Sequence, residues 1–374
     1  DPNFNNQKWY YDAIAAANAW GVKAAKPPVV AVLDTGVMCS HPDLEANMWR
    51  NPDTAAPDVF GYDFVGPDPG IPRQRRAVSR PDPCVSAGDP SDGNGLDDDR
   101  DGDPDGGVTH GTFVAGVVAA TANNGKGVAG ICPVCRVMAV RVANPEGWTR
   151  SDAVASGVSY AASHGAQVIN LSFGGPQVSR AEKTAIDAAV EKGVVVVAAA
   201  GNDGVHPIAY PAALPNVIAV GATDHSRVMG RAAFSNWGSG AEGDRSVDVV
   251  APGVDIVSTA VLSVADQAAG SGRAGASAYE RGSGTSFSAP IVAGLAGLVL
   301  SQNPKLTPDA VKDLLKRTAT PLAKDSVAGT AWAGAGLINV GAALQAAGLT
   351  MRPAPAATSP ATGAQLTSLS GTLA

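Results

Sequence analysis

The stretch Gly282-Ser283-Gly284-Thr285-Ser286-Phe287-Ser288-Ala289-Pro290 is a glycine-rich turn that leads straight into an apolar, small-residue segment at 291–300. That segment is typical of a buried helix, so Ser286 is expected in the first helical turn. A hydroxyl there meets unpaired backbone N–H groups and the positive end of the helix dipole, and both favour the negative charge that develops in acyl transfer. Taken alone, the stretch favours the simpler interpretation of Ser286 as an N-cap residue.

Two further stretches supply the partners that a nucleophilic serine needs. Residues 29–36, VVAVLDTG, form an apolar run that ends in a carboxylate and a glycine turn. This pattern predicts a buried parallel strand with Asp34 at its carboxyl end, where open α/β sheets place their sites. Residues 109–116, THGTFVAG, put His110 at the start of a second apolar helix. The order Asp, His, Ser therefore offers the carboxylate, base and nucleophile of a serine-hydrolase triad.

Four short blocks together resemble the subtilases, the subtilisin-like serine proteases, and most of all their thermitase branch. The blocks are Asp34-Thr35-Gly36, His110-Gly111-Thr112, Ala200-Gly201-Asn202 and Gly284-Thr285-Ser286, and matches run from residue 1 to about 348. The resemblance implies a serine endopeptidase in which Ser286 attacks a peptide carbonyl, His110 takes its proton and Asp34 orients His110. It also implies an oxyanion hole made by the side-chain amide of Asn202 and the backbone N–H of Ser286.

The fold class follows from alternating helix and strand signals. They predict an α/β fold with a mostly parallel central sheet and helices on both faces, and the resemblance implies the three-layer subtilisin-like arrangement. Expected helices span 12–20, 110–121, 151–164, 179–192, 291–300, 307–318 and 339–347. Expected strands span 29–34, 136–142, 167–171, 194–199, 217–220 and 247–251.

One catalytic domain is expected over residues 1–348. An acidic insertion lies at about 67–108, and a Gly/Ala/Ser-rich insertion at about 263–281 is interpreted as a mobile surface loop. Residues 349–374 are rich in Pro, Ala, Ser and Thr, which predicts a tail or linker outside the core.

Charge and hydropathy restrict the partners. The net charge of −7 argues against nucleic acid and anionic membranes. We expect no span apolar for long enough to cross a bilayer, and the polar start of the chain does not resemble a signal peptide. Subtilases are made with a signal and a pro-segment, so the resemblance implies a processed, secreted monomer, or one held at the cell surface through a region beyond the tail. Its expected partners are protein and peptide substrates and its own pro-segment, which would inhibit the enzyme and aid its folding.

Four cysteines form an even set, as expected for two disulfides in an oxidising compartment. The expected pairs are Cys39–Cys84 and Cys132–Cys135. The Cys132-Pro133-Val134-Cys135 stretch is also compatible with a redox pair or half a zinc site, although zinc sites usually repeat the C-x-x-C pair.

Calcium is the expected cofactor. Within the acidic insertion, Asp97, Asp99, Asp101 and Asp103 match the first half of an EF-hand-like loop, but Val108 stands where the twelfth-position acid belongs. The alternative is a solvated, disordered acidic loop.

The thermitase resemblance implies a second kind of calcium site, built on the loop at 123–128. Its ligands by position would be the side chains of Asp1, Asp43 and Asn124 and the backbone carbonyls of Thr121, Lys126 and Val128. Asp63 and Asp68 fall where a further thermitase site has acids, but Gly66 replaces a third acid there, which puts that site in doubt.

The resemblance also suggests where substrate binds. Gly147, Trp148 and Thr149 lie where the family pairs an extended segment with the substrate backbone, and the bulk of Trp148 and Thr149 would narrow or cap the outer subsites. The S1 pocket would be formed by Ser172, Phe173, Gly174, Ala199, Ala200, Gly201, Asp203 and Ala209. Most of these residues are small and apolar, which predicts aromatic or large apolar P1 residues. Asp203 is expected at the rim, where it would add tolerance of basic P1 residues.

Three alternatives remain at this stage. Asp34-Thr35-Gly36 is also an aspartic-protease signature, but that chemistry needs a second such carboxylate and the chain has no second D-T-G. An α/β-hydrolase would need G-x-S-x-G, and Ser288 occupies the final glycine position. The chain could also be a catalytically inactive binding scaffold on the subtilase fold.

Overall fold

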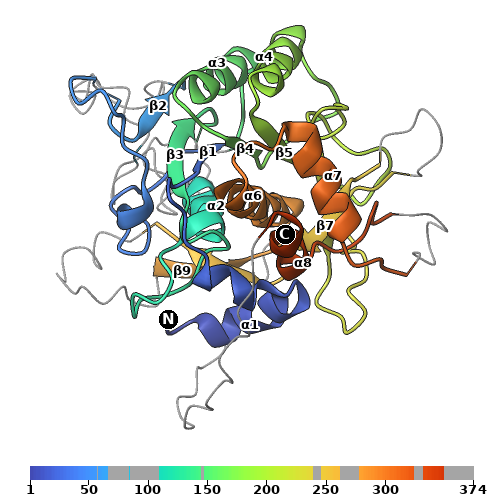
Figure 1. Cartoon of the computed structure of the whole chain (residues 1–374). Helices are drawn as coiled ribbons and strands as arrows, with labels where there is room; N and C mark the ends of the chain where they lie inside the picture. Colours follow the sequence, from blue (N-terminus) through green and yellow to red (C-terminus); the bar gives the residue numbers. More distant parts are fainter. Residues whose placement is uncertain are drawn as a thin grey trace, which may run out of the picture.

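A computed structural model describes residues 1–56, 58–65, 84, 109–144, 147–238, 246–261, 278–323 and 332–348. Its centre is a seven-stranded parallel sheet in the order β2-β3-β1-β4-β5-β6-β7 (Figure 1). The strands are β2 (Gly61–Asp63), β3 (Arg136–Arg141), β1 (Val29–Asp34), β4 (Val168–Leu171), β5 (Val195–Ala199), β6 (Ile218–Thr223) and β7 (Val249–Pro252). Valine-rich strands that are buried on both faces are typical of a parallel sheet covered by helices.

Helices cover both faces of this sheet, so the predicted three-layer α/β architecture is confirmed. The helices α3 (Ser151–Ser163) and α4 (Arg180–Glu191) pack on one face, and α2 (Thr109–Ala119) and α6 (Thr285–Gln302) lie on the other (Figure 1). The remaining helices are α1 (Phe4–Ala13), α7 (Pro308–Thr318), α8 (Val340–Ala346) and the short 3-10 helices η1 (Ala16–Gly21) and η2 (Glu45–Asn47).

Helix α6 is the core element of the fold. Every residue from Ser288 to Leu300 is buried, and the helix packs across β4, β5, β6 and β7. By length and composition alone α6 could also cross a membrane, contrary to the sequence-based expectation that no such span exists. Of the residues in this apolar window, 78% are buried inside the protein, which identifies α6 as a core helix of this fold.

Two local expectations were wrong. The helix expected at 12–20 is instead α1, which starts at Phe4, followed by η1; Ala15, at φ +54°, breaks the helical path between them. The end of the Gly/Ala-rich insertion is not loop. Its residues from Tyr279 to Gly282 form β9, which pairs antiparallel with β8 (Ile256–Thr259) and leads directly into α6.

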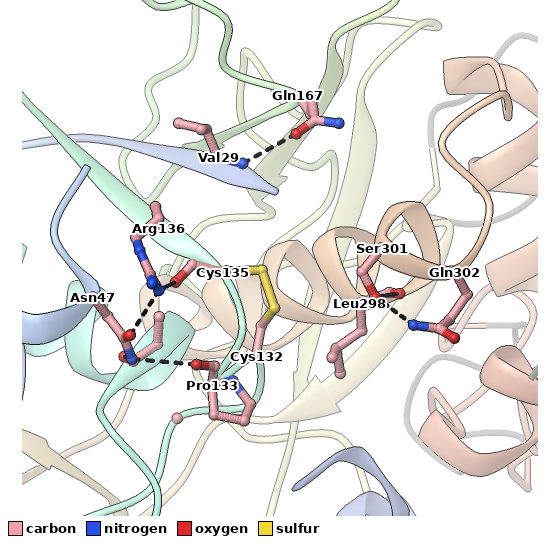
Figure 2. The surroundings of a disulfide bond; sticks show 12 residues. Val29, Asn47, Cys132, Pro133, Cys135, Arg136, Gln167, Leu298, Ser301 and Gln302 are labelled. Carbon is pink, nitrogen blue, oxygen red and sulfur yellow. Dashed lines mark hydrogen bonds between the residues drawn. A yellow bond between two sulfur atoms is a disulfide. The ribbon is translucent and has the colours of Figure 1, made fainter. Parts of the chain in front are cut away.

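Both predicted disulfides are present in the structure. Cys39 is bonded to Cys84, and Cys132 to Cys135. The second bond, shown in Figure 2, lies beside α6, where a Cβ on Gly297 would come within 2.6 Å of the Cys135 sulfur. Both sulfurs of this C-x-x-C stretch are buried in the core and bonded to each other, which makes it a structural bridge and argues against a zinc site.

The contact between α2 and α6 predicts one stability effect. A Cβ added at Gly294 would lie 1.7 Å from Cγ2 of the buried, stiff Ile131 side chain and 3.3 Å from the Val118 carbonyl oxygen. Gly294→Ala should therefore lower the free energy of unfolding by about 1–3 kcal/mol, despite the better helix propensity of alanine. Denaturant unfolding measures this change, with Ser156→Ala on the exposed face of α3 as the control. Equal stability of Gly294→Ala and wild type would contradict this packing.

Candidate active site

Asp34 and His110 form the centre of the site. Asp34 is the last residue of β1 and is buried, and its Oδ1 lies 2.8 Å from Nδ1 of His110 on the first turn of α2. Oδ1 also accepts a hydrogen bond from the backbone N–H of Thr35. Oδ2 is buried without a hydrogen-bond partner in the described part of the chain, so His110 is the one ionisable partner that the structure describes for this carboxylate.

Two interlocked turns hold this pair together. The hydroxyl of Thr35 accepts a hydrogen bond from the Gly111 N–H, and that of Thr112 accepts one from the Met38 N–H. A Cβ on Gly111 would lie 2.1 Å from the Gly36 carbonyl oxygen, so only glycine permits this approach. The threonines and glycines that follow Asp34 and His110 in the sequence therefore hold the end of β1 against the start of α2. Sequence reasoning matched these residues as motif letters but did not identify this role.

The environment of His110 favours its protonated form. Burial lowers the pKa of the ring, but the charge of Asp34 and its hydrogen bond raise it by more, so the pKa lies above the usual 6.5. The side chain remains 31% exposed, which leaves the ring open to a substrate. A base with this pKa can accept a proton near neutral pH and hold it.

Ser286 is the second residue of α6, behind the cap residue Gly284. The structure therefore excludes the N-cap role for Ser286. The hydroxyl donates instead to the backbone carbonyl of Ser172, at 2.9 Å, and no described hydrogen bond joins it to His110. His110 is nevertheless close, because its ring lies 5.5 Å from that of Phe287, the next residue after Ser286. A rotation of the Ser286 hydroxyl away from Ser172 is needed before proton transfer to His110.

The orientation of Asn202 follows from its partners. Its Oδ1 accepts hydrogen bonds from both the N–H and the hydroxyl of Thr285, each at 2.8 Å. The amide nitrogen Nδ2 must then point the other way, toward the open space beside Gly284. A Cβ placed there would lie 3.4 Å from Asn202 Nδ2 and 3.7 Å from the Ser286 nitrogen. Two N–H donors thus flank one open space at the start of α6, which is the arrangement that stabilises an oxyanion.

The residues expected to form the S1 pocket converge on Ala209. A Cβ added to Gly174 would lie 2.9 Å from the Tyr210 carbonyl oxygen and 3.1 Å from the Ala209 Cβ. One added to Gly201 would lie 2.3 Å from Asn236 Nδ2 and 3.3 Å from the Ala209 Cβ, so both glycines pack closely against this part of the chain. Ser172, Phe173, Ala199 and Ala200 lie at or just beyond the ends of β4 and β5, next to these glycines in sequence.

The Asp203 carboxylate at the expected rim of this pocket is already engaged. Its Oδ2 accepts a hydrogen bond from Asn236 Nδ2 at 3.1 Å, while Asn236 Oδ1 accepts from the Asp203 N–H. This clasp ties the Asp203 charge to Asn236. Sequence reasoning did not find Asn236, since no local pattern marks it.

The residues of the expected calcium loop also meet. Asp43 is buried and accepts hydrogen bonds from Asn124 Nδ2 at 2.6 Å and from the Val128 N–H at 2.9 Å. Asp1 accepts from the N–H groups of Asn123 and Gly125. Burial raises the pKa of Asp43 by more than its hydrogen bonds and the charge of Lys126 lower it. Thr121 and Lys126 lie on the same stretch of chain.

The other expected metal ligands do not form a comparable group. Asp63 makes an ion pair of 3.5 Å with Arg141, so a guanidinium already matches its charge. Asp68, Asp97, Asp99, Asp101 and Asp103 lie outside the described residues. In the described ranges there is no group of three or more His, Cys, Asp or Glu side chains that could hold a metal ion.

The remaining histidines have structural surroundings. His41 is buried between the Asp43 N–H and the Ala278 carbonyl, and burial lowers its pKa to about 4. His164 stacks on Tyr160, His225 on Trp9, and His206 lies beside Trp237.

Comparisons with known proteins agree with this geometry. A family model described as the subtilase family matches residues 25–336. Thermitase from Thermoactinomyces vulgaris is 35% identical over 92% of this chain and 98% of that protein. Subtilisin BL from Lederbergia lenta is 34% identical over 87% of this chain and 97% of that protein. Among solved structures, a protease from Pseudoalteromonas arctica PAMC 21717 has a TM-score of 0.72 and 31% identity, covering 93% of this chain and 98% of that one.

The Asp34–His110 contact can be tested by titration. Since Asp34 is the main cause of the raised pKa, NMR of the His110 ring should give a midpoint above 6.5 in the wild type. In Asp34→Asn burial dominates, so the midpoint should fall below 6.5. Asp255→Asn, which faces His225 at 3.5 Å on the surface, serves as the control and should leave His110 unchanged. An unshifted His110 midpoint in Asp34→Asn would contradict the assignment.

Proposed function

This chain belongs to the subtilase family, and we propose that it is a serine endopeptidase that cleaves proteins through an acyl-enzyme formed on Ser286. The observation that carries the proposal is the 2.8 Å contact between the Asp34 carboxylate and His110 Nδ1, next to the helix start that bears Ser286. The other Ser–His contact that the structure describes, Ser163 Oγ to His164 Nδ1 at 3.1 Å, has no carboxylate bonded to the ring, because this same nitrogen also faces the Tyr160 carbonyl.

The proposed reaction uses these groups in two steps. Ser286 Oγ attacks the carbonyl carbon of the scissile peptide while His110 Nε2 takes the hydroxyl proton. Asp34 holds the ring in the tautomer that carries hydrogen on Nδ1 and stabilises the imidazolium. His110 then gives its proton to the leaving amine, and a water molecule, activated by the same nitrogen, hydrolyses the ester.

Charge on the tetrahedral intermediate falls on the former carbonyl oxygen. The Asn202 Nδ2 group and the Ser286 N–H are the donors proposed to bind it, and the loss of one such donor costs about 2.7–4 kcal/mol of transition-state stabilisation. The Thr285 hydroxyl supports this arrangement, because it accepts from the Gly201 N–H and donates to Asn202 Oδ1. The donors are thus held in place before substrate binds.

Aromatic or large apolar P1 residues remain the proposed substrates of the S1 pocket. The small residues around Ala209 support this, and the Asp203–Asn236 clasp argues against a strong role of Asp203 in binding basic P1 residues. We further propose that residues 1–348 form the catalytic domain, that 349–374 are a tail or linker, and that the monomeric enzyme is secreted with a pro-segment in its precursor. The two disulfides support an oxidising compartment.

A structural calcium ion is proposed at the loop of residues 123–128. The side chains of Asp1, Asp43 and Asn124 and the carbonyls of Thr121, Lys126 and Val128 would hold it. The donor set fits, because it contains only oxygen, as calcium prefers. The Asp43 carboxylate is buried, and burial raises its pKa despite its hydrogen bonds and the nearby charge of Lys126. The buried Thr121 hydroxyl has no hydrogen-bond partner in the described chain. When bound, the ion would neutralise the two carboxylates and stiffen the loop.

Ser286→Ala tests the catalytic proposal. Since triad members act as a unit, peptide hydrolysis should fall on the order of 10⁶-fold in kcat while the circular dichroism spectrum stays that of the wild type. Ser159→Ala on the exposed side of α3 is the matched control and should keep full turnover. A fluorophosphonate probe should label the wild type and not Ser286→Ala. A wild-type protein that neither labels nor cleaves peptides would favour the inactive scaffold.

Chelation tests the calcium proposal. With calcium at a hundredfold excess over its dissociation constant, binding adds about 2.7 kcal/mol to the free energy of unfolding. EDTA should therefore lower the unfolding temperature measured by circular dichroism and shorten the half-life on heating. Asn124→Ala should shrink this difference, whereas Asn51→Ala, at a half-buried position far from the loop in sequence, should preserve it. Identical melting curves with and without EDTA would contradict the site.

A further inference from the structure

We propose that a groove beside the active site, formed around Glu182 and Trp148, binds a lysine or arginine side chain of the substrate. The inference rests on the proposed endopeptidase function and adds a substrate class to it. It concerns a position outside the S1 pocket.

The groove is a cavity of about 460 Å³, within the size range of ligand sites. One edge is the segment Gly147–Thr149, the other includes Phe173, Gly174 and Gly175, and Val154 and Ile186 contribute apolar floor. Phe173 directly follows Ser172, whose carbonyl accepts the Ser286 hydroxyl. A peptide positioned at Ser286 therefore passes the mouth of the groove.

Glu182 is the one charged residue among the described residues that line the groove. It belongs to a capping box at the start of α4: its Oε2 accepts the Ser179 N–H at 2.7 Å, and the Ser179 hydroxyl accepts the Glu182 N–H. The positive end of the α4 dipole lies at this carboxylate and attracts negative charge. The capping box engages only Oε2, so Oε1 is left to a ligand.

Among the described lining residues, no cation neutralises this carboxylate from within the groove. Of the nearby basic residues, Lys183 pairs with Asp187 at 2.6 Å, and Arg180 is exposed and does not line the groove. Arg150, next to the segment 147–149 in sequence, pairs with Asp152 at 2.7 Å. An apolar substrate side chain in the groove would strip water from Glu182 without replacing its hydrogen bonds, which costs free energy. A cationic side chain supplies both the charge and the N–H donors.

Trp148 complements Glu182 on the opposite edge. This residue is 77% exposed, an unusual state for a tryptophan, while its backbone is fixed by two hydrogen bonds to Asn144. An exposed tryptophan face attracts ammonium and guanidinium groups, and the methylenes of a lysine or arginine stem cover its apolar surface. The groove thus offers an anion and an aromatic ring to one long cationic side chain.

The experiment uses the full chain and quenched fluorescent peptides with phenylalanine at P1 and alanine elsewhere. Lysine or its uncharged analogue norleucine is placed singly at each position from P2 to P6 and from P1′ to P3′. The wild type should prefer lysine at one of these positions by about three- to tenfold in kcat/KM, as expected for one partly exposed charge pair with an aromatic contact. The preference should shrink at high ionic strength.

Three variants identify the source of the preference. Glu182→Gln keeps the capping box, because glutamine can make the same bond to the Ser179 N–H, and it should bring the lysine-to-norleucine ratio to about one. Trp148→Ala should lower that ratio by about two- to threefold. Glu191→Gln removes the same charge from the far end of α4, about 13 Å along the helix, and should keep the wild-type ratio.

Each outcome decides one of the two proposals. If the all-alanine peptide is cleaved but no position prefers lysine, or if Glu182→Gln keeps the preference, the groove proposal is wrong and the peptidase proposal stands. If no peptide is cleaved, the peptidase proposal is wrong. The groove is then decided by fluorescence anisotropy with Ser286→Ala: tighter binding of the lysine peptide that is lost on adding Glu182→Gln supports it, and equal Kd values for both peptides overturn it.

Discussion

The close approach of two glycines, Gly36 after β1 and Gly111 in α2, is the constraint on which the site depends. The gap between them has no room for a side chain, since a Cβ on Gly111 would overlap the Gly36 carbonyl oxygen. This approach lets Asp34 reach His110 directly. The hydroxyls of Thr35 and Thr112 stabilise the approach, because each accepts a hydrogen bond from a backbone N–H of the opposite segment. The carboxylate is buried only because the histidine is its partner, so the fold and the chemistry share one contact.

Ser286, on the same face of the sheet, is held by a separate set of contacts near the end of β7. The Gly284 N–H donates to the Gly253 carbonyl, and the buried Ser288 hydroxyl donates to the last carbonyls of β7. Phe287 joins the two halves, since its ring packs between His110 and Phe113 and lies against Gly282. Histidine and serine are thus positioned by different strands and meet through one aromatic side chain.

Much of this could be read from the sequence, because it is encoded locally. The valine run of β1, the apolar α2 and α6, and the short blocks around Asp34, His110, Asn202 and Ser286 predicted the layers and the candidate triad. Features that depend on tertiary contacts could not be predicted from the sequence. The positive φ of Ala15 has no sequence signal in an alanine-rich segment, and β9 is a strand only because β8 lies beside it. The S-x-x-E pattern at Ser179 predicts the start of a helix, but it does not predict that Glu182 lines a groove.

The strand order has a consequence for how the chain acquires activity. The interior strand β1 comes first in the sequence, yet His110, the partner of its last residue Asp34, lies 76 residues further on. The contact between Ser286 and Ser172 spans 114 residues. Contacts between residues so far apart in sequence form late and slowly, because the chain loses the entropy of closing a long loop before the contact can stabilise it. A nascent chain that has not yet released α6 contains Asp34 and His110 but lacks Ser286, the proposed nucleophile. The proposed catalytic groups therefore come together only once the whole core topology has formed. On the ribosome, the chain lacks the complete site until α6 has been synthesised.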